Sequence, residues 1–184
     1  HRADLHLIVW VRGEGGRSRD VDEEPDVARG ADAVSIHINL GSPNESKMLE
    51  IGANVARECT RWGMPLLTMI YPRGKGIDPF SPAAVGHCVR VAEALGAALI
   101  KPNYPGDPEA FRKIVKACSV PVFIAGGEKT GDLESLKIIR DSVKVGGAGV
   151  CVGRNAFQRE DTTSFVKSLC KVVHDDVDPE NALG

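Results

Sequence analysis

Short apolar runs alternate with longer amphipathic segments along this 184-residue chain, and this alternation constrains the fold more than any other feature. Six runs have the length and β-branched content of buried strands. All but the first are followed by a segment of helical length, which predicts an α/β fold with a parallel sheet and right-handed crossovers. The predicted strands span residues 5–11, 33–39, 66–71, 97–101, 120–125 and 149–152.

Helix boundaries carry recognisable signals. A Ser or Asp followed by Pro occurs at three expected helix starts, where the first side chain caps the helix and proline occupies its first position. Glu45 completes a capping box at the first of these starts. Gly63 and Gly96 stand where the preceding helices should end. The three pairs are Ser42 with Pro43, Ser81 with Pro82, and Asp107 with Pro108.

The spacing of the strands selects an architecture. Their centres recur every 23–32 residues or so, the length of one βα unit, whereas a closed eight-stranded barrel usually needs about 250 residues. We therefore predict a TIM (β/α)8 barrel of which about the last six units are present, in one domain over residues 30–184. Residues 1–29 should hold a poorly defined first strand and a loop, because residues 12–26 are polar and rich in glycine. An open sheet exposes two edges, so either a partner chain covers them or the fold is only marginally stable.

Composition narrows the class of protein. The chain is 42% hydrophobic and 26% charged, with a net charge of −2 and a pI of about 6.2, as is typical of one soluble domain. Interspersed charges favour neither a nucleic-acid nor a membrane partner. Five widely spaced cysteines indicate reduced core thiols, and no segment resembles a signal peptide, so we expect a cytoplasmic protein.

Lys101 is the strongest candidate for chemistry. It ends the apolar run at 97–101, and an amine held inside a barrel loses hydration. Desolvation lowers the pKa of a lysine, which leaves a neutral amine able to attack a carbonyl and form a Schiff base. The alternative is a lysine that has passed the end of its strand into solvent.

Glycines follow the last two predicted strands. Gly126 and Gly127 end one run, and Gly153 and Arg154 end the next, at the expected start of a short helix. Loops after the last two strands of a barrel commonly bind phosphate through backbone N–H groups, and an arginine adds a charged fork. The alternative is that these are turn and packing glycines.

Other polar residues end the neighbouring strands. Tyr71 should lie near the Lys101 amine and could shuttle a proton, while Arg73 could attract an anionic substrate. His37 and Asn39 should face the same mouth. The alternatives are a solvated basic loop for Arg73 and a hydrogen-bonded structural role for His37. The remaining histidines lack metal-ligand spacing, so we expect no metal.

Five motifs together resemble the DeoC/FbaB-type class I aldolases, most closely the branch of archaeal-type fructose-bisphosphate aldolase and 2-amino-3,7-dideoxy-D-threo-hept-6-ulosonate synthase. They run in order and, with a matching tail around CKVVHDD, cover roughly residues 30–183. The resemblance implies a TIM barrel, a Schiff-base lysine at Lys101, an acid/base tyrosine at Tyr71, phosphorylated sugar substrates, no metal or cofactor, and a homo-oligomer. The motifs are GADAVSIHINLGS, RWGMPLLTMIYPRGK, GAALIKPNYPGD, VPVFIAGGEKT and GAGVCVGRNAFQ.

Departures from the family pattern leave alternatives open. Family members begin with two further strands, the first of which carries an acid/base aspartate in a DHG-like motif, and we identify no counterpart in this sequence. We expect a class I aldolase or transaldolase acting on a phosphorylated ketose, either a simple aldolase or a synthase. One alternative is a shortened, catalytically impaired member that serves as a phosphate-binding or assembly subunit. Another is a phosphosugar isomerase.

Overall fold

Five parallel strands form a continuous arc in the computed structural model, which describes residues 32–127 and 130–184. The strands pair in sequence order, and an isolated bridge between Ile100 and Val122 joins the third to the fourth. This is the strand order of a TIM barrel, seen here as part of one. The expected strand at 5–11 and the expected boundary at 29–30 lie outside the described residues. The strands are β1 (Val34–Leu40), β2 (Leu66–Pro72), β3 (Leu99–Lys101), β4 (Phe123–Ala125) and β5 (Gly149–Cys151).

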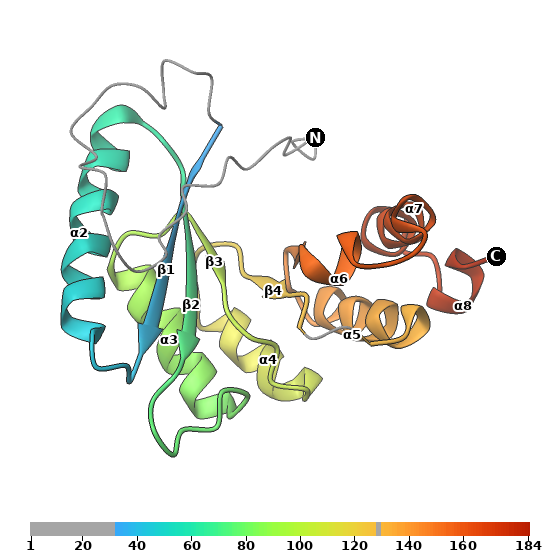
Figure 1. Cartoon of the computed structure of the whole chain (residues 1–184), viewed down its shortest axis with the longest axis horizontal. Coiled ribbons are helices and arrows are strands. Elements are labelled where there is room, and N and C mark those ends of the chain that lie inside the picture. The colour runs from blue at the N-terminus through green and yellow to red at the C-terminus, as the bar shows by residue number, and fades with distance from the viewer. Residues whose placement is uncertain (1–31, 128–129) are drawn as a thin grey trace.

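A helix follows each of these strands, so the predicted alternation is confirmed for the described part of the chain. The long helix α2 lies beside β1 at the left of Figure 1, and the later helices follow the arc round to the C-terminus. None of the helices in the described ranges is long and apolar enough to cross a membrane. The helices are α2 (Glu45–Trp62), α3 (Pro82–Ala94), α4 (Pro108–Lys116), α5 (Asp132–Lys144), α6 (Arg154–Phe157), α7 (Thr162–His174) and α8 (Pro179–Ala182).

The two faces of the strand arc differ in character. One face packs on the helices: Ile38, Ile70 and Ile100 are at most 1% exposed and share a core cluster with Val85 and Val89 of α3. Side chains alternate along a strand, so the residues between these isoleucines face the other way, toward the barrel interior. The functional candidates lie on that inner face.

Only one of the three predicted helix caps forms as expected. Asp107 accepts hydrogen bonds from the N–H groups of Glu109 and Ala110, at 2.9 and 3.3 Å. Ser81 occupies the N-cap position of α3, with proline next, but its side chain makes no capping bond. The prediction for Ser42 is wrong, because α2 begins at Glu45 with Asn44 at the N-cap. Glu45 instead accepts a hydrogen bond from the backbone of Gly41.

Cysteines divide between core and surface. Cys59 and Cys88 are buried, as expected for core thiols. Cys170 is exposed, so the prediction of a core position is wrong there. It lies on the outward side of α7, away from the face that buries Phe165, Leu169 and Val172. Cys151 is half-buried on β5.

Candidate active site

The first three strands bring His37, Asn39, Met69, Tyr71 and Lys101 to one face of the sheet. In the parallel ladder Met69 is opposite both His37 and Lys101, while Tyr71 is opposite Asn39. Opposed residues of neighbouring strands point to the same side, and residues two apart do so as well. The expected convergence of these side chains at the strand ends is therefore built into the register.

Lys101 is the last residue of β3 and is half-buried. The alternative that it has passed beyond the strand into solvent is wrong, because it still pairs with Met69. Burial lowers the pKa of Lys101 below its ordinary value of 10.5, and a negative charge on Cys151 would act in the opposite direction. Burial therefore favours the neutral amine that carbonyl attack requires.

Tyr71 is 9% exposed, and its ring contacts two other candidates. His37 meets it edge-on, with ring centroids 5.2 Å apart, and the Arg73 guanidinium carbon lies 5.5 Å from the ring centroid. Burial above all, together with a charge on Cys151, raises the pKa of Tyr71 to about 12, although Arg73 lowers it. The phenol therefore keeps its proton at neutral pH.

His37 and Arg73 are both exposed at the mouth of the arc. The His37 Nε2 atom lies 3.0 Å from the Asn39 Oδ1 atom, so one ring nitrogen of His37 is hydrogen-bonded within the protein. Arg73 donates its backbone N–H to Leu40 and stacks over Tyr71 rather than extending free into solvent. The prediction that both residues contact substrate remains a prediction.

Cys151 is a site residue that the sequence pattern did not single out. It ends β5 opposite Ala125, and it interacts electrostatically with both Lys101 and Tyr71. Burial raises the pKa of the Cys151 thiol, and Lys101 lowers it. The available signal was alternation: Cys151 lies two residues before Gly153, at the same strand end as the other candidates.

The glycine loops after β4 and β5 lie side by side. A Cβ atom on Gly126 would come within 2.7 Å of Val152 Cγ1, so the loops approach as closely as a bare backbone allows. Gly127 has a φ of +66°, a conformation that favours glycine. Gly153 is the N-cap of α6, and the exposed Arg154 is its first residue.

A backbone hydrogen bond ties this glycine region to the lysine. Ala125, directly before Gly126, donates its N–H to the carbonyl of Pro102, directly after Lys101, at 3.0 Å. The candidate phosphate loop thus follows the strand next to that of the candidate nucleophile. In the described part of the chain no three His, Cys, Asp or Glu side chains cluster as a metal site would require.

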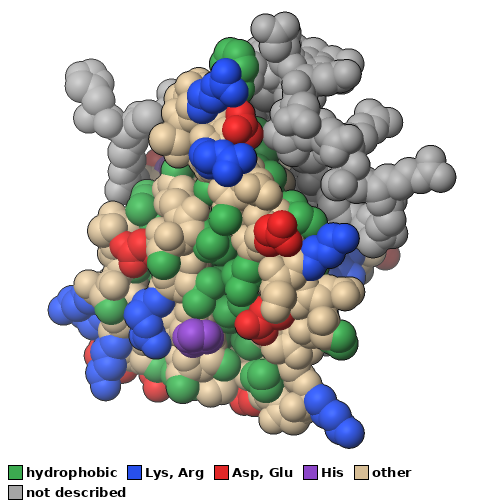
Figure 2. Space-filling view, turned by 90° about the vertical axis from the view of Figure 1, so that its left-hand side faces the viewer, with side chains coloured by type: hydrophobic (Ala, Val, Ile, Leu, Met, Phe, Trp, Pro, Cys, Tyr) green, Lys and Arg blue, Asp and Glu red, His purple; other side chains and the backbone are tan. Residues whose placement is uncertain are grey.

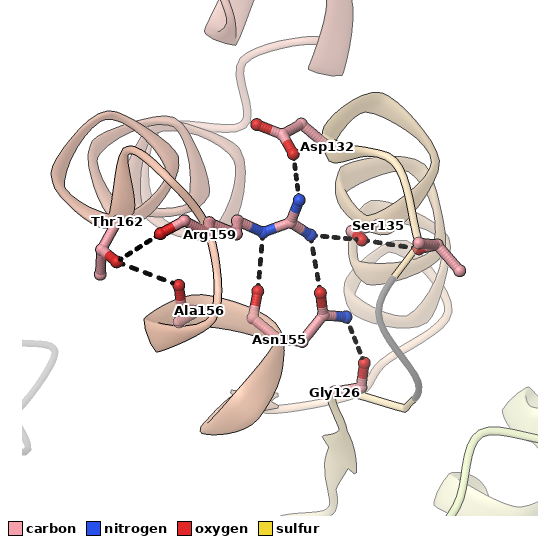
Figure 3. Close-up of polar contacts among 8 residues, drawn as sticks. Gly126, Asp132, Ser135, Asn155, Ala156, Arg159 and Thr162 are labelled. Atoms are coloured by element: carbon pink, nitrogen blue, oxygen red, sulfur yellow. Dashed lines mark hydrogen bonds and ion pairs between the residues drawn. The ribbon is translucent and has the colours of Figure 1, made fainter.

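A buried polar network, also missed in the sequence, lies behind the glycine loops. Asn155 donates to the Gly126 carbonyl at 2.7 Å, and the Arg159 guanidinium binds Asn155, Ser135 and Asp132 (Figure 3). These partners come from segments more than 20 residues apart, so no local pattern announces the network.

Comparisons with known proteins identify the family of the chain. A family model described as DeoC/LacD family aldolase matches residues 17–159. The chain is similar to 2-amino-3,7-dideoxy-D-threo-hept-6-ulosonate synthase of Halobacterium salinarum, with 47% identity over 87% of the chain and 60% of the relative. It is also similar to 2-amino-4,5-dihydroxy-6-oxo-7-(phosphonooxy)heptanoate synthase of Streptomyces griseus, with 44% identity over 82% of the chain and 56% of the relative.

The chain is also similar in fold to solved structures of aldolases. An archaeal fructose 1,6-bisphosphate aldolase superposes with a TM-score of 0.81 at 36% identity, over 89% of this chain and 66% of that one. A Schiff base-forming fructose-1,6-bisphosphate aldolase superposes with a TM-score of 0.78 at 37% identity, over 81% and 61%. The chain spans less than two thirds of the length of each of these proteins. The family match and these identities show that the chain belongs to the DeoC/LacD family of aldolases.

Proposed function

We propose that this protein is a class I aldolase or transaldolase that acts on a phosphorylated ketose through a Schiff base on Lys101. The observation that carries the proposal is the half-buried amine at the end of β3, whose pKa burial lowers, on the same face as Tyr71. A neutral amine in a barrel is suited to attack a carbonyl. The names of the relatives support the reaction: one aldolase structure is described with its catalytic lysine bound to a carbinolamine intermediate.

Lys101 would attack the ketone carbon of the substrate to form a carbinolamine, and loss of water would leave an iminium ion. When the bond between the carbons α and β to the iminium carbon breaks, its electron pair forms the carbon–carbon double bond of an enamine and the C=N π electrons return to nitrogen. The hydroxyl of the departing aldehyde loses its proton in the same step. Tyr71 is the proposed acid/base group: its phenol first protonates the carbinolamine hydroxyl, which leaves as water. The phenolate formed in that step, which Arg73 favours, then accepts the proton of the aldehyde hydroxyl. The reverse step uses the phenol: the enamine attacks an aldehyde and Tyr71 protonates the new alkoxide.

The phosphate group is assigned to the loops after β4 and β5. Gly126, Gly127 and Gly153 offer close backbone approach, and Arg154 offers an exposed charge at the same edge. This site lies one strand from Lys101, so a ketose phosphate could bridge the two. His37 and Arg73 are assigned to the opposite side of the substrate.

The acceptor distinguishes two forms of this function. A simple aldolase would release the enamine fragment after protonation and hydrolysis. A synthase would pass it to an amino-aldehyde, as the names of the Halobacterium and Streptomyces relatives suggest for those proteins. We propose the synthase form, because these relatives share 47% and 44% identity with the chain, against 36% and 37% for the two fructose-bisphosphate aldolases.

We also propose that the protein works in the cytoplasm as a homo-oligomer, without a metal or organic cofactor. The free thiols of Cys59 and Cys88 suit a reducing compartment. Figure 2 looks onto the side of α2, where hydrophobic side chains lie among charges of both signs. Ile51 and Trp62 of this helix are 40% and 51% exposed, and their spacing of three turns places them on one line.

Borohydride trapping tests the proposed function. The protein is incubated with dihydroxyacetone phosphate or, in a separate sample, with fructose 1,6-bisphosphate. Borohydride then reduces any Schiff base, and intact mass and peptide mapping locate the adduct. We expect an adduct on Lys101 that is lost in Lys101→Met. Tyr71→Phe should still form the adduct but should exchange or cleave substrate about 100-fold more slowly, the usual contribution of one acid/base group.

The control for both variants is the thermal unfolding midpoint, which shows that each is folded. A folded wild-type protein that gives no adduct with any phosphorylated ketose would contradict the proposal and favour the non-catalytic alternative. Retention of activity in Lys101→Met would instead favour an isomerase.

A further inference from the structure

Arg159 is a buried guanidinium close to the glycine loops. Its side chain is 5% exposed, whereas Arg154, five residues earlier, is exposed. Burial of an arginine is unfavourable unless its charge is paired and its N–H groups are bonded. The partners of the Arg159 guanidinium therefore show what stabilises its buried charge.

Donors of Arg159 point to two separate segments (Figure 3). Its Nε atom donates to the Asn155 carbonyl at 2.7 Å, and its Nη2 atom donates to Asn155 Oδ1 at 2.7 Å and to Ser135 Oγ at 2.9 Å. Asp132 forms an ion pair with Arg159, and the centroid of the Phe165 ring lies 3.8 Å from the guanidinium carbon. With its charge paired and its donors engaged, Arg159 serves the protein rather than a bound anion.

Asn155 extends this network to the candidate phosphate loop. It is 4% exposed, and its Oδ1 must be the atom that faces Arg159, because arginine has donors only. The Nδ2 group is thereby turned toward Gly126, whose carbonyl accepts it at 2.7 Å. Arg159 thus decides which end of the amide reaches Gly126.

The bond to Gly126 has a consequence for the next residue. A trans peptide places its carbonyl and its N–H on opposite sides, and the described residues contain no cis peptide. Asn155 holds the Gly126 carbonyl, so the N–H of Gly127 must point away from Asn155. Val152, which follows β5, packs against the other side of Gly126: a Cβ atom added to Gly126 would lie 2.7 Å from Val152 Cγ1.

We propose that Asn155 and Arg159 are positioning residues that fix the Gly126–Gly127 peptide with its N–H turned to the substrate phosphate. Arg154 would supply the positive charge that attracts the phosphate, and the buried pair of Asn155 and Arg159 would hold the peptide N–H in the orientation that binds it. The identity of the ligand as a ketose phosphate rests on the proposed function. The positioning itself concerns only a phosphate group and can be measured without the reaction.

The test is a titration of the ¹⁵N-labelled protein with inorganic phosphate. The chemical shift of the Gly127 amide in the NMR spectrum is the readout. We expect a saturable shift in the wild type. Asn155→Ala keeps the backbone acceptor of Arg159 but removes the bond to Gly126, so it should weaken phosphate binding by about tenfold, the effect of one lost hydrogen bond. Arg159→Lys, which keeps a charge for Asp132 but loses the fork, should shift the midpoint in the same direction and serves if Asn155→Ala does not fold.

Arg140→Met is the matched control. Arg140 is a second poorly exposed arginine, with 11% side-chain exposure, but it pairs with Asp176 and Asp178 more than two turns along α5 from Asp132. This variant should bind phosphate like the wild type, whatever its stability. The proposal is overturned if the wild type shows no saturable shift, if Asn155→Ala and Arg159→Lys keep its midpoint, or if Arg140→Met loses as much affinity.

Trapping with two trioses separates this inference from the proposed function. Asn155→Ala should need about ten times more dihydroxyacetone phosphate for half-maximal trapping, yet should trap dihydroxyacetone, which lacks the phosphate, like the wild type. An equal loss with both trioses would indicate a merely structural role. Absence of trapping in the wild type beside a normal phosphate titration would contradict the aldolase but not the positioning.

Discussion

Lys101 illustrates how one residue acquires a function from its surroundings. The side chain is an ordinary lysine, but the end of β3 and the inner face of the arc remove part of its hydration. Loss of hydration penalises the charged form, so the neutral amine becomes available at lower pH. The same burial acts on Tyr71 in the opposite sense, because the charged form of a phenol is the deprotonated one.

The pKa of Lys101 gives the first prediction at this scale. We expect its amine to lose its proton with a midpoint below the ordinary 10.5, because burial disfavours the ammonium ion. Reductive ¹³C-dimethylation and NMR titration would measure the midpoint, and Lys101→Met would identify the signal. A midpoint at or above 10.5 would contradict the assigned environment of the amine.

Some residues of the candidate site could be predicted from the sequence, and others could not. Lys101 and Tyr71 follow apolar runs directly, and residues at the ends of parallel strands meet at one edge of a sheet. Asn155 and Arg159 owe their positions to α5, whose contributing residues Asp132 and Ser135 are more than 20 positions away. No periodicity encodes that contact, since only the tertiary fold brings Arg159, in the connection after α6, to Asp132 and Ser135 of α5.

At the scale of elements, helix starts show where local signals succeed. Asp107 and Ser81 both precede a proline, yet only Asp107 makes capping bonds. The carboxylate of Asp107 has two acceptor oxygens and a longer reach than a hydroxyl. At Ser42 the tertiary connection after β1 overrides the pattern, and α2 starts two residues later than predicted, at Glu45. Existence of the helices was predictable, while their first residues depended on geometry.

The two caps form a matched pair for a prediction. Asp107→Ala should lower the free energy of unfolding by about 1 kcal/mol, because two N–H groups of α4 lose their acceptor. Ser81→Ala should change it by less than about half of that, since no side-chain bond is lost. Urea unfolding followed by circular dichroism would measure both. Equal effects of the two substitutions would contradict the difference between these caps.

At the scale of the molecule, the order of the five described strands follows from chain order. Consecutive βα units place each new strand beside the last, which is why five of the six predicted strands are found within the described residues, in sequence. The contacts that close the C-terminus onto the core were not predictable. They join α8 to α5 and α7 through single side chains whose partners the sequence does not specify.

Two of these contacts differ in environment, and the last prediction depends on that difference. The Ser168 hydroxyl is buried and donates to the Ala182 carbonyl at 2.7 Å. The ammonium of Lys137 meets Glu180 at 2.7 Å, but both side chains are more than half exposed, so water and salt screen the pair. Each contact ties α8 to a different helix.

Ser168→Ala should lower the free energy of unfolding by about 1 kcal/mol, because a buried acceptor loses its donor. The cost should not exceed this, because Lys171 also donates to the Ala182 carbonyl, at 3.3 Å. Lys137→Met should change the free energy by less than about 0.5 kcal/mol. Urea unfolding at low and high salt would measure both, with only the Lys137 effect falling as salt rises. A larger loss in Lys137→Met than in Ser168→Ala would mean that charge rather than buried hydrogen bonding holds α8 on the barrel.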